Sequence, residues 1–293
     1  MPLNFTEIST GELIGSTVLA RNVLLAATQG VDQDIQQQIR RVKNWRKEYL
    51  GVYRALAKAE FYQEQNGLEI ASAGLDILAK SIRDESGRDL NQIVEAGWVG
   101  DAQVETFIVS GTEPLRQLSV AGISSLTDAA QIWAHEKLAE PGLVGSFKFL
   151  DAHKKLPIAM DLLIALAGGA EYAPTKHWLS VGGTVAVVAR GNTQRWLELI
   201  AHARNSGGTL LVPVLKSRVP QNAISLTDEA IAQNAGLDIC DDAEALAGWV
   251  AALSMTRKER IVLGQYAYAP GAKHILVQAV QDALAAKVCA KLP

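Results

Sequence analysis

Apolar positions in the middle of the chain fall in short continuous runs, separated by glycine pairs and amphipathic segments. Such runs predict three strands, at Leu162–Ala167, Thr184–Ala189 and Thr209–Val214. Glu171–Val181 reads as a short helix between the first two strands, and Thr193–Asn205 as a clear amphipathic helix between the last two. Continuous apolar strands separated by helices predict a parallel sheet that is covered on both faces.

The N-terminal region has the helical pattern instead. In Gln33–Glu64 apolar residues recur every three or four positions, which predicts one long helix with a single buried stripe. Asn66-Gly67 is expected to end this helix, and a second helix follows over Leu68–Arg83. Two antiparallel helices joined by a short turn are the plain interpretation.

Shorter elements flank the central unit. The predicted strands are Val104–Ser110, Gly145–Leu150, Leu237–Cys240 and Arg260–Ala269, and the predicted helices are Ser125–Leu138, Thr227–Ala235, Ala243–Leu253 and His274–Lys287. Together the pattern predicts an α/β protein with a Rossmann-like, doubly wound parallel sheet. We expect a mainly helical N-terminal region with one or two strands over residues 1–155, and a Rossmann-like dinucleotide-binding domain over residues 156–293.

The first central strand ends in a turn of small residues. Gly168, Gly169, Ala170, Glu171 and Tyr172 read as G-x-A-x-x, close to the dinucleotide fingerprint G-x-G-x-x-G/A. Small residues there permit a tight turn and let backbone amides approach a pyrophosphate. The alternative is a structural β–α turn in a protein that binds no nucleotide.

The residue at the tip of the second strand suggests which dinucleotide would bind. NAD-binding proteins carry an acid at this place, whereas this chain has Arg190, followed by Asn192 and Arg195. A guanidinium suits the 2′-phosphate of NADP, so NADP is the expected cofactor. The alternative is a solvated arginine at a strand end.

These residues make the central unit resemble the Rossmann-fold NAD(P)-binding reductases, and it is loosely similar to the short-chain dehydrogenase superfamily. The resemblance covers about the last 135 residues and implies a dinucleotide fold and hydride-transfer chemistry. The superfamily's glycine signature T-G-x-x-x-G-x-G is not met. Its Tyr-x-x-x-Lys pair occurs as Tyr172 and Lys176, but in the turn, so its catalytic role is not carried over.

The predicted catalytic residues lie after the last strand. Tyr266 and Tyr268 alternate at its end, and Lys273 opens the next helix. A tyrosine whose pKa is lowered by a nearby lysine can pass a proton to a carbonyl oxygen during hydride transfer. The alternative is that these tyrosines only pack and that the lysine faces water.

Composition excludes several classes of protein. The 293 residues carry a net charge of -3, which does not suggest a nucleic-acid binder, and two distant cysteines argue against a disulfide scaffold or a zinc site. The five histidines have no metal-binding spacing, and no P-loop or G-x-S-x-G elbow occurs. No signal peptide or spanning segment is evident, so we expect a cytoplasmic protein without nucleic-acid or membrane partners.

The expected function is therefore an NADP(H)-dependent oxidoreductase that transfers hydride to or from a carbonyl or imine carbon of a small molecule. The expected partners are this small-molecule substrate and further copies of the chain in a homo-oligomer. The alternative is a non-catalytic Rossmann-like module that senses a nucleotide or binds a protein. A third class, an enzyme dependent on S-adenosylmethionine, is less consistent with Arg190, because an acid commonly holds the ribose there.

Overall fold

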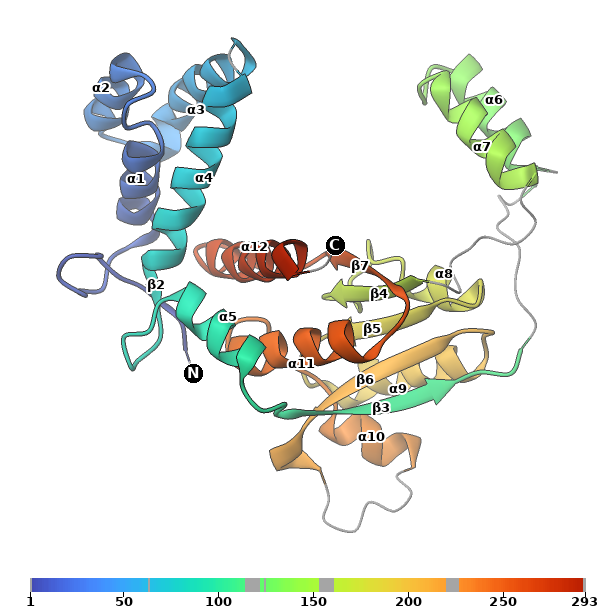
Figure 1. Ribbon diagram of the computed structural model, residues 1–293. Coiled ribbons are helices and arrows are strands. Elements are labelled where there is room, and N and C mark those ends of the chain that lie inside the picture. The colour runs from blue at the N-terminus through green and yellow to red at the C-terminus, as the bar shows by residue number, and fades with distance from the viewer. Residues whose placement is uncertain are drawn as a thin grey trace. The chain divides into compact units, whose positions relative to one another are not determined.

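The computed structural model describes residues 2–62, 64–113, 122–123, 125–152, 161–219 and 227–291 (Figure 1). The chain forms two compact units. The helical unit comprises Met1–Ala102, Ile239–Ala251 and Ala267–Pro293, and the sheet unit comprises Gln103–Asp238 and Ala252–Tyr266. The predicted domain boundary, between residues 155 and 156, lies outside the described residues.

Helices dominate the first unit. Its elements are β1 (Asn4–Phe5), α1 (Ser16–Ala27), α2 (Gln33–Arg41), α3 (Trp45–Tyr62), α4 (Glu64–Lys80), β2 (Ile82–Arg83), α5 (Leu90–Val99) and α12 (Lys273–Lys291). The inner faces of α2, α3 and α4 meet in one apolar cluster that includes Ile39, Val52, Leu56 and Ile70. The two short strands pair antiparallel.

The expected helix boundaries in this unit are partly wrong. Instead of one helix over Gln33–Glu64, the chain breaks between α2 and α3, where Val42 is extended and the Glu48 side chain accepts a 2.8 Å hydrogen bond from the Asn44 amide. That local bond gives α3 a start of its own. The expected break at Asn66-Gly67 does not occur, because α4 continues through Gly67. Packing of α4 on α1 and α3 outweighs the low helix propensity of glycine.

The second unit is built on a five-stranded sheet. Its strands are β3 (Val104–Ser110), β4 (Asp161–Leu166), β5 (Thr184–Val188), β6 (Thr209–Leu215) and β7 (Arg260–Gln265), in the order β3-β6-β5-β4-β7. The four strands β6-β5-β4-β7 are parallel, and β3 pairs antiparallel with β6 at the edge. The α/β class is confirmed. The expectation of an all-parallel, doubly wound sheet is wrong, since the sheet contains one antiparallel pair and lacks the full Rossmann strand order.

Among the described residues of this unit, three helices cover one face of the sheet: α8 (Thr175–Ser180), α9 (Thr193–Arg204) and α10 (Asp228–Asn234). Their core centres on Trp196, which is fully buried among side chains such as Leu163, Val187 and Val212. The strand residues that point to the other face, such as Ile164 and Val188, are also fully buried. The continuous apolar strands were therefore read correctly, because both faces exclude water.

Two predicted strands are wrong. Gly145–Leu150 lies within the helix α7 (Gly142–Ala152), which pairs with α6 (Leu126–His135) through the rings of Trp133 and Phe147, 6.1 Å apart. Leu237–Cys240 forms no strand, and just before it Ala235 makes an isolated antiparallel bridge to Val214. The remaining elements are a 3-10 turn at Lys216–Arg218 and α11 (Ala243–Thr256), whose residues are divided between the units. Among the described helices none is long and apolar enough to cross a membrane.

Candidate functional site

The order of the parallel strands marks one place in the sheet unit for a ligand. β4 is the first of the four along the chain, and it lies between β5 and β7. The chain passes from β4 to β5 and β6 on one side and then crosses to β7 on the other side, so the strand order reverses between β4 and β7. In open α/β sheets ligands bind at such a switch point, outside the carboxyl ends of the strands. The turn of Gly168 and Gly169 follows β4 at this edge.

Close packing fixes the first glycine of the turn. The Gly168 amide donates to the carbonyl oxygens of Ala165 and Val188, each at 3.0 Å, and its own carbonyl accepts a 2.6 Å bond from the buried Thr175 hydroxyl. A Cβ on Gly168 would lie 3.0 Å from side-chain carbons of Ala165 and Val187. Gly168 therefore serves the tight junction of β4, β5 and α8, as expected of the first fingerprint glycine.

The following amides are the candidate anion donors. The Ala170 amide is used within the turn, since it donates to the Ala167 carbonyl at 2.8 Å. The amides of Gly169, Glu171 and Tyr172 donate to no acceptor in the described part of the chain. Residues 171–174 form a turn rather than the expected helix start, and α8 begins at Thr175 with only six residues. Any anion would be held by amides of the turn rather than by the end of a long helix.

Arg195 lies directly against this turn. A Cβ added to Gly169 would stand 3.1 Å from Cδ of Arg195. The arginine is placed by the start of α9, where the Asn192 side chain accepts a 2.9 Å bond from the Arg195 amide. Asn192 is thus a helix cap, and Arg195 is exposed beside the turn. The structure brings the predicted residues Gly169, Asn192 and Arg195 together.

Arg190 occupies the carboxyl end of β5 with its backbone held and its side chain exposed. Its carbonyl accepts a 3.2 Å bond from the Trp196 indole, and the neighbouring Ala189 carbonyl accepts from the Leu237 amide at 2.9 Å. Neither Arg190 nor Arg195 forms an ion pair with any described residue. Two cationic side chains thus follow the carboxyl ends of β4 and β5, which we call the β4–β5 edge, without a carboxylate partner among the described residues.

Gly236 is a part of this edge that sequence reasoning missed. Its φ is +116°, and a Cβ there would lie 2.7 Å from the Ala189 carbonyl oxygen and from the Gly191 nitrogen. The Arg218 side chain also donates to the Gly236 carbonyl at 3.2 Å. The only signal in the sequence is a lone glycine just after a helix, at a position compatible with many other turns.

Tyr266 reaches the same edge through the sheet ladder. Its amide donates a 2.9 Å bond to the Leu166 carbonyl, next to the glycine turn. Its ring folds back over Gly264, where a Cβ would lie 2.3 Å from Cε2, and packs against the core cluster of the sheet unit. Burial raises the pKa of the Tyr266 phenol, which is opposite to the lowering that a lysine was expected to cause.

The other two predicted catalytic residues belong to the helical unit. Tyr268 is 79% exposed, and its ring centroid lies 5.0 Å from that of His274. Lys273 is the first residue of α12 and is exposed. The described contacts join Tyr268 to the start of α12 and not to the glycine turn.

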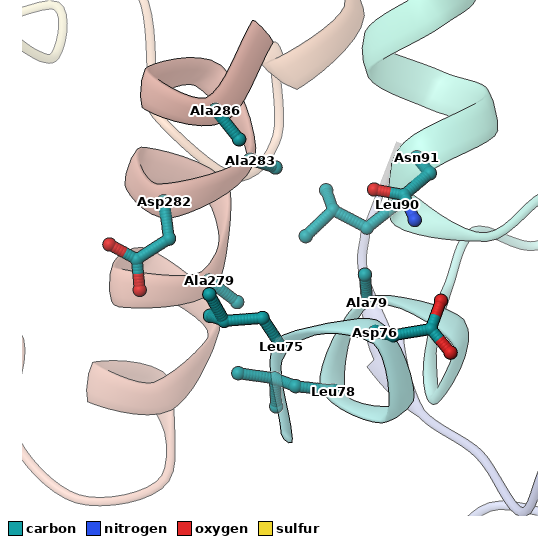
Figure 2. A pocket seen from close by; sticks show the side chains of 10 residues that line it. All are labelled: Leu75, Asp76, Leu78, Ala79, Leu90, Asn91, Ala279, Asp282, Ala283 and Ala286. Atoms are coloured by element: carbon teal, nitrogen blue, oxygen red, sulfur yellow. The ribbon is translucent and has the colours of Figure 1, made fainter. Parts of the chain in front are cut away.

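A second candidate lies within the helical unit. A cavity of about 230 Å³ opens between α4, α5 and α12, and Figure 2 shows aliphatic side chains such as Leu78, Leu90 and Ala283 around it. Asp76 and Asp282 stand at its margin, but Asp76 already pairs with Lys80 at 2.7 Å. None of the predicted site residues lines this cavity, and it offers apolar surface without a defined polar anchor.

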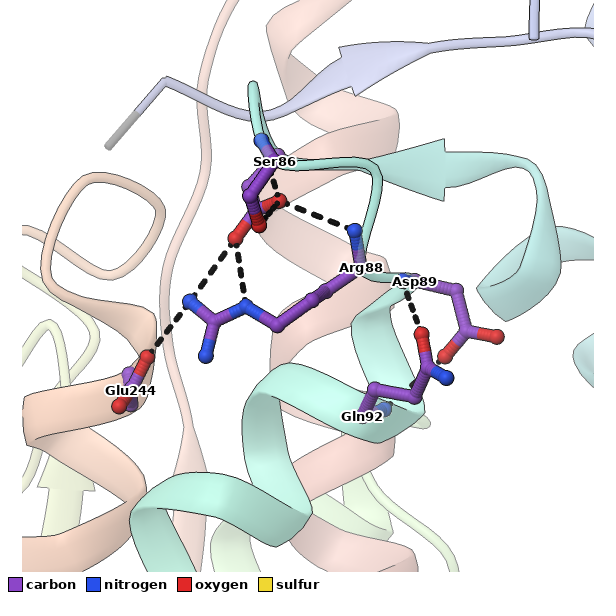
Figure 3. A network of polar contacts seen from close by, with 6 residues as sticks. Ser86, Arg88, Asp89, Gln92 and Glu244 are labelled. Atoms are coloured by element: carbon purple, nitrogen blue, oxygen red, sulfur yellow. Dashed lines mark hydrogen bonds and ion pairs between the residues drawn. The ribbon is translucent and has the colours of Figure 1, made fainter.

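A polar network in the same unit has a structural explanation. The carboxylate of Asp84 accepts from the amide and hydroxyl of Ser86 and from the amide and guanidinium of Arg88. Arg88 also bridges to Glu244 at 2.8 Å (Figure 3). Burial acts to raise the pKa of Asp84, but the hydrogen bonds together lower it. The network orders the turn before α5, whose first residues are capped by Asp89.

No group of three or more His, Cys, Asp or Glu side chains among the described residues is arranged to hold a metal ion. Comparison of the chain with protein-family models, curated proteins and solved structures finds no match. The function of the protein is therefore inferred from the geometry of the β4–β5 edge.

Proposed function

We propose that the sheet unit binds NADP(H) at the carboxyl ends of β4 and β5, and that the protein is an NADP(H)-dependent oxidoreductase. The substrate class is a small molecule with a carbonyl or imine carbon. We propose a cytoplasmic protein, whose copies associate if the helical unit supplies a contact surface. The resemblance to Rossmann-fold reductases is part of this proposal.

One observation carries the proposal: the glycine turn with its unpartnered amides follows β4 at the switch point of the sheet, Arg195 lies against this turn, and Arg190 follows the neighbouring strand β5. Strand order β6-β5-β4-β7 corresponds to the order 3-2-1-4 within the Rossmann sheet. Amides of Gly169, Glu171 and Tyr172 suit a pyrophosphate, and the guanidiniums of Arg190 and Arg195 suit a 2′-phosphate. The residues present therefore fit the dinucleotide.

The role of this chain in the reaction is to bind and orient. When bound, the nicotinamide supplies the hydride, and the protein supplies position and charge. Tyr266 is the candidate proton holder, since its amide bonds to Leu166 next to the turn and its phenol, like any tyrosine, carries its proton at neutral pH. The catalytic role of Tyr268 and Lys273, which belong to the helical unit, stays a prediction from the sequence.

The placement of Tyr266 also favours the rival function. A phenol that folds over Gly264 and packs on the core cluster has a sufficient structural reason to be there. A Rossmann-like module that binds a nucleotide without reacting, or that binds a protein, would need no proton donor. Hydride transfer to a carbonyl compound, lost in Tyr266→Phe while NADPH binding persists, separates the enzyme from this module.

Fluorescence titration of the full chain with NADPH and NADH tests the binding step. We expect NADPH to bind more tightly than NADH, and Arg190→Asp to weaken NADPH binding at least about tenfold because a charged contact to phosphate is lost. Arg54→Asp is the matched control, since Arg54 is exposed on α3 and its replacement by aspartate changes the net charge by the same amount. Equal NADPH affinity in Arg190→Asp and wild type would contradict the cofactor assignment.

A further inference from the structure

The outer face of α3 carries cations and exposed apolar side chains in one stripe. Arg46, Leu50, Arg54, Lys58 and Phe61 follow each other at spacings of four, four, four and three, which places them on one side of a helix. Leu50 is 62% exposed and Phe61 84% exposed. We call these five residues the α3 stripe.

The inner face of α3 explains why the stripe points outward. Val52 and Leu56 are buried in the cluster with α2 and α4, and they leave the opposite side of the helix to solvent. Tyr53, 51% exposed, and Tyr62, 77% exposed, lie beside the stripe. Exposed leucine and aromatic residues in this number need a reason, because α3 has already satisfied its packing within the unit.

The segment around the α3 stripe is positively charged, whereas the whole chain is negatively charged. Residues 40–62 hold seven of the 28 lysines and arginines and two of the 31 acids, so they carry +5 while the chain carries -3. One of those two acids, Glu48, is used to cap α3 through the Asn44 amide. Arg46, Arg54 and Lys58 form no ion pair with any described residue. The net charge of the whole chain, which does not suggest a nucleic-acid binder, therefore conceals this positively charged segment.

We infer that the α3 stripe binds the surface of an anionic lipid bilayer peripherally. Lysine and arginine are attracted to acidic headgroups, while Leu50 and Phe61 enter the headgroup boundary as the apolar side of an interfacial helix. Tyr53 and Tyr62 have the amphipathic rings that favour this depth. A nucleic-acid surface would use the cations and rings but give Leu50 no role, so a membrane is the better match.

Vesicle co-sedimentation of the full chain tests this inference. The probes are vesicles of phosphatidylcholine alone and vesicles with roughly one third phosphatidylserine, at low and high salt. Arg46→Gln/Arg54→Gln/Lys58→Gln removes three charges, and Leu50→Gln/Phe61→Gln removes the apolar contacts; glutamine keeps the helix propensity in both. The matched control is Lys137→Gln/Lys148→Gln/Lys258→Gln, which alters three exposed lysines of the sheet unit. Circular dichroism checks that each variant folds.

The expected result is binding to the phosphatidylserine vesicles that weakens with salt, falls at least about tenfold in the triple α3 variant and also falls in the double variant. The control triple should bind as wild type does. Lack of binding to anionic vesicles would overturn the inference, and so would an equal loss in the control triple. Tighter binding to a poly(U) RNA than to vesicles, or self-association that the α3 triple abolishes, would assign the stripe to another partner and overturn it too.

Discussion

Arg195 lies against Gly169, with its Cδ 3.1 Å from the position that a Cβ of residue 169 would occupy. This contact ties the start of α9 to the turn after β4. It places a guanidinium beside amides that have no acceptor in the described residues. A Cβ at position 169 would force the Arg195 side chain to shift by a few tenths of an ångström. The second glycine therefore keeps this arginine close to the turn, whereas the first glycine preserves core packing.

The difference between the two glycines gives the first prediction. Gly168→Ala is expected to destabilise the protein by about 1–3 kcal/mol, because the added methyl meets Ala165 and Val187 in a tightly packed core. Gly191→Ala is the control, since its Cβ would meet only the Ala235 carbonyl oxygen, at 3.6 Å. Urea unfolding measures both free energies of unfolding. Similar losses in the two variants would contradict the packing role of Gly168.

Tyr266 and Gly264 are expected to be coupled. Gly264→Ala places a methyl 2.3 Å from Tyr266 Cε2 and 2.6 Å from its hydroxyl oxygen, so the ring must leave its place at a cost of about 1–3 kcal/mol. In a Tyr266→Ala background the same substitution should cost much less. A double-mutant cycle from denaturant unfolding measures this coupling. An unchanged cost in the second background would show that the ring does not lie over Gly264.

The raised pKa of Tyr266 predicts a distinct titration. Tyrosinate absorbance of the folded protein should contain a component that ionises above the usual tyrosine value of about 10, and Tyr266→Phe should remove it. The native state holds this proton more tightly than the unfolded chain does. Its contribution to stability is therefore complete below about pH 10 and is lost as pH rises through the native pKa. If Tyr266→Phe instead removes a component that ionises near the usual tyrosine value, the burial of the phenol is refuted.

Asp84 should make stability depend on acid pH. Its native pKa lies below the unfolded value of about 3.9, so its stabilisation is present above that value and is lost as pH falls through the native pKa. Asp84→Asn should cost about 1–3 kcal/mol near neutral pH and progressively less in acid. Asp76→Asn, which removes an exposed pair with Lys80, should cost less than about 1 kcal/mol. Thermal unfolding across pH gives both values, and a pH-independent cost for Asp84→Asn would argue against the hydrogen-bonded carboxylate.

The sequence pattern predicted the sheet core well where burial imposes it. β4, β5 and β6 were found within a residue or two, because side chains such as Ile164 and Val187 must be apolar on both faces of a covered sheet. Gly145–Leu150 was misread as a strand, since a short apolar run has no period that separates a strand from a helix. The antiparallel direction of β3 could not be predicted from the local pattern either, because strand pairing is a long-range property.

The candidate site was predictable only where local rules apply. The glycine turn, the cap by Asn192 and the arginine at the end of β5 are local signals, and the structure places them at one edge. The contact of Gly236 with the tip of β5 joins residues about 46 positions apart, and no local sequence pattern predicts it. The pKa of Tyr266 was expected to be lowered but is raised, because the burial of the phenol depends on the packing of its ring over Gly264.

The most direct test of the central claim is to observe where NADPH binds. Backbone amide shifts of the labelled full chain, recorded while NADPH is added, report each residue separately. We predict the largest changes at Gly169, Glu171, Tyr172 and Arg190, with saturation as the site fills. No saturable change, or changes confined to the cavity of α4, α5 and α12, would contradict dinucleotide binding at the β4–β5 edge.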